Sequence, residues 1–464
     1  MKKIISTILL SCLCLANFGQ EAPQIKIKFS EIYATYSFVQ QLTKYYPDSE
    51  YKKAFKNSEY NNDKYNKLIA QIDTLDLYVS ADFQGYPAGQ KLPLMTNNII
   101  NKNLISSKNL LEFRNKMFGI IPSSELQALN NIIESFIPVY KALIYTPNKK
   151  QFDEKVQDLK HFAKKEGFDE YFNVGLKFYN SKWDNSIVFD IVVIPSLNKN
   201  GFTATAFMNN AVSEIQIDFE QYDILFSVLM HEIFHIQYDE ESLKVKTDID
   251  QWFKNNASKN SQYAYLLLNE VLATALGNGY VYEQLNNELD PYDWYNNKYI
   301  NLMAKKIYPT VMEYIEEQKP IDEEFVNIYI SLYDEHFSTW VNELDNILTY
   351  RYILSFDQND FNYFFANYPY ASFSFMEDVI DVVSISKMKE APITKVVVIS
   401  KKNSATLKLL TEHITELSAW NYDAEIDFVK TFDLDDKTKL FIVNSVNTSP
   451  EVLLNNSFPN KKIE

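Results

Sequence analysis

The chain has 464 residues and a formal net charge of −16, with 46% hydrophobic and 23% charged residues. This balance excludes wholesale disorder, and the length allows two or three domains, each with its own core. Because so acidic a chain repels phosphate backbones, nucleic acid is not an expected partner.

The first 19 residues have the three parts of an export signal. Lys2 and Lys3 form a basic start, residues 4–18 are apolar, and Gly19 precedes a suitable cleavage point. The apolar run is shorter than the roughly 20 residues that span a bilayer, and no later stretch reaches that length, so no transmembrane segment is expected. The protein is therefore expected to be exported, to the periplasm or to the outside of the cell.

The cysteines leave a second interpretation of the same segment open. Leu9, Leu10 and Ser11 precede Cys12 in the manner of a lipoprotein signal, and Cys12 would then carry a lipid anchor at the cell surface. Cleavage after Gly19 would instead remove both cysteines, Cys12 and Cys14, and leave a mature chain without a disulfide.

The periodicity of the apolar residues predicts a mainly helical α+β fold. Residues 20–95 form a mostly helical N-terminal region that begins with a short alternating segment, IKIKF. A central region, residues 96–390, continues with helical spacing to about residue 180. Three strand-like segments follow at 186–194, 201–208 and 213–219, and they predict an antiparallel sheet.

Two apolar helices follow the strands, and a small module ends the chain. The first helix includes residues 224–236 and is apolar nearly all round, so it belongs inside a domain. The second runs from about 263 to 282 and weakens at Gly277 and Gly279. Residues 391–464 are expected to form a separate C-terminal α/β module, because strand, helix and strand patterns succeed one another at 395–400, 404–417 and 439–445.

The sequence HEIFH within the first apolar helix predicts a zinc site. Residues four apart lie on one face of a helix, so His231 and His235 can point both imidazoles at one metal ion. Glu232 is one step round the helix, where it can reach a metal-bound water without binding the metal. Two histidines and a glutamate would otherwise be costly to bury in so apolar a helix.

A catalytic zinc ion takes three protein ligands and a water, so a third ligand is needed. Glu270 is the best candidate, since it stands alone in the apolar run LLLNEVLATAL, and Thr274 one turn later could orient a ligand. Glu240 and Glu241 are poor candidates because they follow the histidines directly, in what we expect to be a solvated end of the helix. Asp248 and Asp250 are further alternatives.

With these residues, the region 186–282 resembles the gluzincin branch of zinc metallopeptidases, which have the thermolysin-like fold. The resemblance implies a zincin-like core of antiparallel sheet, active-site helix and glutamate helix, with one zinc ion per chain bound by His231, His235 and Glu270. Glu232 would be the catalytic general base that activates the zinc-bound water. The layout of the chain also resembles secreted bacterial metallopeptidases that are poorly characterised.

The resemblance also implies a substrate strand and an oxyanion donor. Extended protein or peptide substrate would pair with the strand at 201–208 or with that at 213–219. His336 is the candidate oxyanion donor, with Tyr280 and Tyr282 as rivals. The aminopeptidase motif that ends Met-Glu-Asn has Asn209 in place of its glutamate here, which favours an endopeptidase over an exopeptidase.

Two other classes of function stay open on the sequence. The zinc site could brace two core helices in a non-catalytic secreted binding or structural protein, or it could serve a zinc hydrolase that acts on something other than peptides. A structural site would fill the fourth ligand position with protein, whereas a catalytic site leaves it to water.

Overall fold

The computed structural model describes residues 24–198, 203–400, 403 and 405–457. Over these residues the fold is mixed α and β and mainly helical, as the sequence predicts. The predicted export signal and Cys12 lie outside the described residues. Within them, no helix has both the length and the apolar composition needed to cross a membrane.

The chain forms two compact units, and each is made of segments that are distant in the sequence. The first unit contains residues up to Ser80, then Met95–Leu176 and Lys182–Ile236; the second contains Ala81–Leu94, Lys177–Ser181 and Gln237–Glu464. This division follows neither of the predicted boundaries at residues 95 and 390, because helices before and after residue 95 pack together in the first unit.

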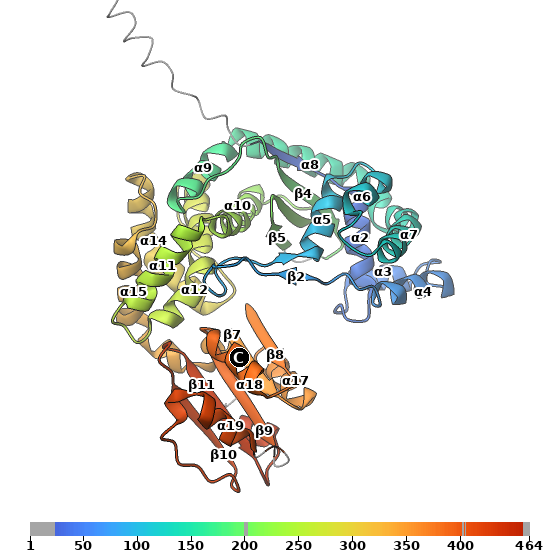
Figure 1. Ribbon diagram of the computed structural model, residues 1–464. Helices are drawn as coiled ribbons and strands as arrows, with labels where there is room; N and C mark the ends of the chain where they lie inside the picture. The colour runs from blue at the N-terminus through green and yellow to red at the C-terminus, as the bar shows by residue number, and fades with distance from the viewer. Residues whose placement is uncertain (1–23, 199–202, 401–402, 404, 458–464) are drawn as a thin grey trace, which may run out of the picture. The chain divides into compact units, whose positions relative to one another are not determined.

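The first unit joins a bundle of helices to a small sheet (Figure 1). Its helical elements are α2 (Glu31–Leu42), α3 (Glu50–Lys56), α4 (Asp63–Ile72), α5 (Thr96–Ser106), α6 (Leu110–Met117), α7 (Ser123–Tyr140), η1 (Lys141–Tyr145), α8 (Thr146–Lys165) and α9 (Phe168–Phe178). Its strands are β1 (Ile25–Lys28), β4 (Phe189–Ser196), β5 (Thr203–Phe207) and β6 (Asn210–Gln216). The short strands β2 (Ser80–Ala81) and β3 (Leu94–Met95) pair separately, and the division of the chain passes through both.

The sheet of the first unit is mixed, so the predicted antiparallel sheet is wrong. Its strand order is β1-β4-β6-β5; β4 runs parallel to both β1 and β6, and only β5 and β6 are antiparallel. A tight turn at Met208 and Asn209 makes β5 and β6 antiparallel neighbours. Every residue of β4 is buried, as expected for a strand inside a parallel arrangement.

The core of the first unit lies between this sheet and the helices around α2. Helix α2 packs against α5 and α7, and Val39 on α2 shares a fully apolar cluster with Phe136 on α7 and with Val192 on β4. Ser30 caps α2 by accepting a hydrogen bond from the amide of Tyr33. The unit ends with α10 (Tyr222–Asp239), whose last residues from Gln237 belong to the second unit.

The second unit has a helical layer followed by a five-stranded sheet (Figure 1). The helical elements are α11 (Leu243–Asn255), α12 (Ser261–Thr274), η2 (Ala275–Val281), α13 (Tyr282–Asn286), α14 (Lys298–Glu316), α15 (Glu323–Phe337), η3 (Ser338–Asn342), α16 (Leu344–Ile347), α17 (Gln358–Asn367), α18 (Val382–Glu390), α19 (Ala405–His413), η5 (Thr415–Leu417) and α20 (Pro450–Ser457). The strands are β7 (Tyr350–Ser355), β8 (Phe373–Glu377), β9 (Thr394–Ser400), β10 (Phe428–Asp433) and β11 (Lys439–Ser445).

At the positions of the strand, helix and strand expected in the C-terminal module, the structure has β9, α19 and β11; β9 and β11 are parallel, and β10 lies between α19 and β11 in the chain. Its predicted start at residue 391 is too late, because β7 and β8 belong to the same sheet, in the order β10-β11-β9-β7-β8. The module is also joined to α12. Gln262 donates a hydrogen bond to the carbonyl of Pro392, and the hydroxyl of Tyr263 lies 3.0 Å from that of Thr394.

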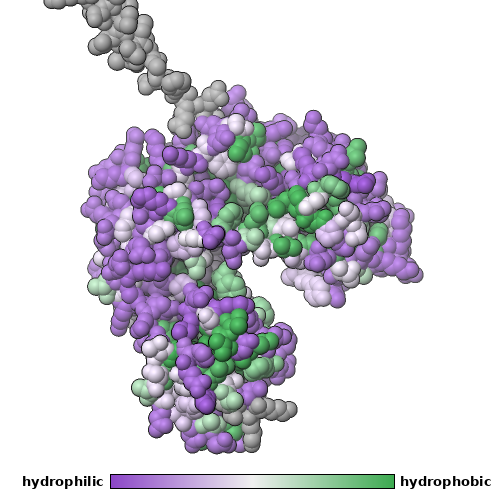
Figure 2. All heavy atoms as spheres, in the orientation of Figure 1, coloured by the Kyte–Doolittle hydropathy of each residue, from purple (hydrophilic) through white to green (hydrophobic). Residues whose placement is uncertain are grey.

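Strand β8 is one edge of this sheet and carries aromatic residues on the surface. Phe373 and Phe375 are 36% and 42% exposed and pack edge to face. Hydrophobic surface gathers over this part of the second unit in Figure 2, where most of the visible surface is hydrophilic. The loop before β8, residues 368–372, therefore leads from helix α17 to an apolar edge of the sheet.

Candidate metal centre

The two histidines of the motif face each other on α10. Their Nε2 atoms are 3.1 Å apart, and the ring planes are nearly perpendicular. Two nitrogen ligands of a tetrahedral zinc ion, each roughly 2.0–2.1 Å from the metal, would be about 3.3–3.4 Å apart. His231 is buried and His235 is half-buried, so the pair lies at the boundary of the core.

Helix α10 is fixed in place because most of its surface is apolar and packs against other side chains. Phe226, five residues before His231, makes edge-to-face contacts with Phe162, Phe168 and Tyr171 in the first unit. Further buried positions on the helix are Leu225, Leu229, Met230, Ile233 and Phe234. Burying these side chains leaves the polar face of the helix narrow, and it is on this face that the histidines lie.

Glu270 joins the two histidines in a group that could hold a metal ion. The candidate ligand atoms of His231, His235 and Glu270 all lie within 4.8 Å of one another. Glu270 is half-buried on α12, among the buried residues Leu267 and Val271. Two imidazoles and one carboxylate are the donor set of a catalytic zinc site that leaves a fourth position for water.

Two tyrosines that the sequence analysis missed lie next to Glu270 in the second unit. Tyr295 lies in the segment before α14, where the charge of Glu270 acts on it, and the Tyr370 hydroxyl donates a 3.3 Å hydrogen bond to that of Tyr295. Burial, together with the Glu270 carboxylate, raises the pKa of Tyr295. Its hydroxyl therefore stays protonated at neutral pH.

The three residues predicted as oxyanion donors lie outside helices α10 and α12. His336 lies in the exposed last turn of α15, where its Nε2 is 3.5 Å from a carboxylate oxygen of Glu335. Tyr280 and Tyr282 are half-buried in η2 and at the start of α13, in the helix that continues α12. Such π-helical segments are frequent at functional sites. His336 does not belong to the group of candidate metal ligands.

The acidic alternatives to Glu270 are engaged in ion pairs on and near α11. Asp248 pairs with Lys244, and Asp250 pairs with Lys254 at 2.8 Å. Glu241 is completely buried, so the expectation of a solvated stretch is wrong there. Thr274 is also buried, on the same helix as Glu270.

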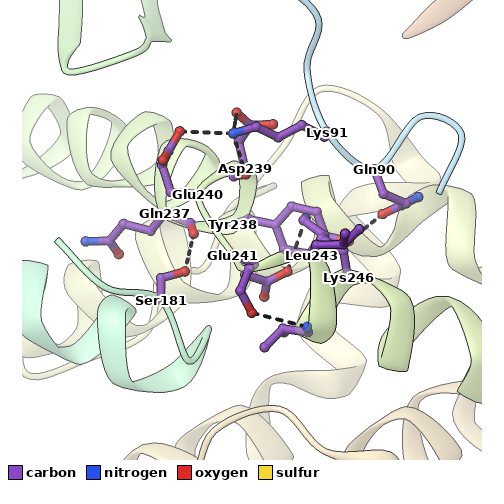
Figure 3. Close-up of polar contacts among 12 residues, drawn as sticks. Gln90, Lys91, Ser181, Gln237, Tyr238, Asp239, Glu240, Glu241, Leu243 and Lys246 are labelled. Carbon is purple, nitrogen blue, oxygen red and sulfur yellow. Dashed lines mark hydrogen bonds and ion pairs between the residues drawn. The ribbon is translucent and has the colours of Figure 1, made fainter. Parts of the chain in front are cut away.

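The C-terminal end of α10 is fixed by polar contacts within the second unit (Figure 3). Lys91 donates to the carboxylates of Asp239 and Glu240, each at 3.0 Å, and the Tyr238 hydroxyl donates to Gln90. Burial opposes the charge of Lys91, yet these carboxylates raise its pKa. The segment Ala81–Leu94 is thereby tied to the end of the histidine helix.

A buried ion pair lies at the same end of α10. The Nζ of Lys246 is 3.1 Å from a carboxylate oxygen of Glu241 and 3.0 Å from the centre of the Tyr238 ring. Burial raises the pKa of Glu241 to about 7 and lowers the pKa of Lys246 to about 8, and the attraction between the two groups opposes both shifts. The pair thus joins Glu241, two residues after the end of α10, to α11.

Comparisons with known proteins add no family to this geometry: no family model, no curated protein and no solved structure matches the chain.

Proposed function

We propose that this protein is an exported zinc metallopeptidase of gluzincin type that hydrolyses peptide bonds. The observation that carries the proposal is the group formed by His231, His235 and Glu270, three side chains of the ligand types that zinc uses in catalytic sites. Glu232 supports it further, because it is half-buried on the same helix, one residue from His231.

Three residues of the chain, His231, His235 and Glu232, would each have a separate role in the reaction. When bound, zinc polarises the scissile carbonyl and lowers the pKa of a coordinated water toward about 7. His231 and His235 bind as neutral imidazoles through Nε2, the atoms that face each other. Glu232 accepts a proton from the attacking water and returns it to the nitrogen of the leaving amine.

Strand β5 is the candidate for pairing with substrate. β6 lies between β4 and β5 and has no edge to offer, whereas no strand of the described residues pairs with the outer side of β5. An extended peptide could add to this edge through main-chain hydrogen bonds, which do not depend on the substrate's side chains. The proposal therefore assigns substrate pairing to Thr203–Phe207 and not to the following strand.

The setting of Asn209 favours an endopeptidase. Its side-chain amide donates a 2.8 Å hydrogen bond to the carbonyl of Val188, the residue before β4. The side chain at this position thus ties the β5–β6 turn to the neighbouring strand. No carboxylate stands there to bind a free amino terminus.

Zinc analysis and peptide-library cleavage, applied to the wild type and to Glu232→Gln, test the proposal. We expect about one zinc per chain in both proteins and cleavage by the wild type alone, because the substitution removes the general base and keeps the ligands. The matched control is Asp223→Asn, which removes another acid from the first turn of α10 and should cleave like the wild type.

The outcomes separate the classes of function. Equal cleavage by wild type and Glu232→Gln would contradict the general-base assignment. Bound zinc without cleavage by either protein would favour a structural zinc site in a binding protein, and cleavage of non-peptide substrates alone would favour another zinc hydrolase. Absence of zinc would overturn the proposal as a whole.

A further inference from the structure

Strand β8 forms one edge of the five-stranded sheet, and the backbone groups on its outer side are open. Among the described strands, only β7 pairs with β8. The amide of Phe373 donates a 3.2 Å hydrogen bond to the carbonyl of Thr349, the residue before β7. Because the direction of the backbone groups alternates along a strand, those of Ser374 and Met376 point away from the sheet.

The side chains beside this open edge are apolar and exposed. Phe373 and Phe375 lie on one face of β8 with their ring centroids 4.4 Å apart, and the Phe375 ring lies 5.2 Å from that of Tyr352 on β7. The chain after β8 adds Val379 and Val382, which are 52% and 47% exposed. Figure 2 shows hydrophobic surface gathered over this part of the second unit. Exposed apolar surface of this kind is typical of an interaction site.

The opposite edge of the same sheet carries charges that β8 lacks. Strand β10 has the exposed side chains of Lys430 and Asp433, and charged residues on an edge strand discourage pairing with another chain. Strand β8 contains neither lysine nor proline, and its one charged residue, Glu377, accepts a hydrogen bond from Tyr352 and lies 3.3 Å from Lys387. Of the two edges, β8 is therefore the one that is open to a further strand.

The open backbone and the nearby charges define the chemistry of the partner. Outward N–H and C=O groups at alternate positions match the backbone of another extended chain, whose alternate side chains would lie against the two phenylalanine rings. Glu377, Asp378 and Asp381 make the end of β8 acidic; Asp378 and Asp381 are exposed, and Lys387 offsets one of the three charges. This charge favours lysine or arginine on the partner.

We propose that the outer edge of β8 binds an extended peptide segment with apolar side chains at alternate positions and basic residues at one end. The segment pairs with Ser374 and Met376 through main-chain hydrogen bonds, and its apolar side chains pack on the two exposed phenylalanine rings. The inference goes beyond the proposed function, because it uses no residue of the zinc site and holds for a binding protein as well as for a peptidase.

Fluorescence anisotropy of a labelled peptide, Lys-Val-Lys-Val-Thr-Val-Thr, tests the inference on the full-length chain. Every protein carries Glu232→Gln, so that the proposed peptidase activity does not consume the probe. We expect Phe375→Ser to weaken binding by about tenfold or more, since the ring covers apolar side chains of the peptide. Met376→Pro should also weaken it, because proline removes an outward amide and leaves the hydrogen bonds to β7 in place.

A matched control and altered peptides separate strand pairing from general apolar contact. Phe118→Ser changes a phenylalanine of the first unit that is 76% exposed, and it should leave the affinity unchanged. N-methylation of alternate residues blocks the amides on one edge of the peptide, so one of the two alternate sets should abolish binding while the other is tolerated. Replacement of both lysines by glutamates should weaken binding.

The outcomes decide between the peptide and other occupants of the edge. Equal affinities for the parent protein, Phe375→Ser and Met376→Pro would overturn the inference, as would tolerance of both N-methylated peptides. A parent protein that sediments as a dimer and becomes a monomer on Phe375→Ser would also overturn it, because a second copy of the chain would then occupy the edge. No step of the measurement needs zinc, so a protein that binds no zinc would contradict the proposed function and leave this inference standing.

Discussion

Lys246 and Glu241 form an ion pair of 3.1 Å in which neither side chain has any solvent exposure. Two charges taken out of water cost more than their attraction returns unless other groups also stabilise them. Here the Tyr238 ring lies directly against the ammonium group and contributes a cation–π contact. The pair follows the histidine helix by two residues, so its stability bears on how firmly that helix ends.

Removal of one partner of this pair should destabilise the protein strongly. Glu241→Gln leaves the Lys246 charge buried without its counter-ion, and we expect a loss of about 3–5 kcal/mol in the free energy of unfolding. The double variant Glu241→Gln/Lys246→Met should recover most of that loss. Unfolding in denaturant measures the free energy of unfolding of the wild type, the single variant and the double variant.

The matched control for the pair lies on the same helix. Lys244 pairs with Asp248 at the surface, with the lysine side chain 82% exposed, so Lys244→Met should change the unfolding free energy little. If Glu241→Gln proved as mild as this control, the pair would not be buried in solution as it is in the structure.

The same pair should make stability depend on pH. The pKa of Glu241 is raised above its unfolded value, so its contribution is present at low pH and is lost as pH rises to about 7. The pKa of Lys246 is lowered, so its contribution is present at high pH and is lost as pH falls to about 8. Relative to the double variant, the wild type should therefore be least stable between these values.

Unfolding free energies of the two proteins across this range provide the measurement. The difference between wild type and double variant should pass through a minimum near neutral to slightly alkaline pH. A difference that is constant with pH would mean that neither group changes its pKa on folding.

The tie between Lys91 and Asp239 should hold the segment Ala81–Leu94 in place. Asp239 also accepts a hydrogen bond from the amide of Leu92, at 2.6 Å, so Asp239→Asn weakens two contacts at once. We expect faster hydrogen exchange at the Leu92 amide and faster proteolysis within the segment. Glu240→Gln, which alters only a half-exposed partner of Lys91, should change both rates much less; equal rates for the two variants would argue against the tie.

Gly279 is required for close packing in the helix that continues α12. A Cβ atom there would lie 2.8 Å from ring atoms of both Trp294 and Tyr308. Gly279→Ala should therefore destabilise the protein by about 1–3 kcal/mol, because the two rings have to move apart. Thermal unfolding measures the effect, and an unchanged or raised transition temperature would show that the rings can adjust without cost.

The local part of the candidate site could be predicted from the sequence. His231, Glu232 and His235 are set by the helical repeat alone, and the apolar run of α10 identifies the helix. Glu270 stood out as a single carboxylate in a second apolar run. These predictions need only the spacing along one helix and the cost of burying a charge.

The rest depends on contacts between distant segments. Tyr295 and Tyr370 look like any of the 32 tyrosines in the sequence, and only the folded chain brings them beside Glu270. Glu241 follows two acidic residues and so resembled a solvated position, but Lys246 pairs with it in the interior. The predicted antiparallel sheet was wrong for the same reason, since alternation of apolar residues predicts strands without predicting which strands pair.

Anomalous X-ray diffraction at the zinc edge, from crystals of the full-length protein, tests the central claim most directly. We predict one strong peak within roughly 2.0–2.2 Å of Nε2 of His231, Nε2 of His235 and a carboxylate oxygen of Glu270, with water in the remaining position. A peak elsewhere, or a fourth protein side chain in the coordination shell, would contradict a catalytic zinc centre on these residues.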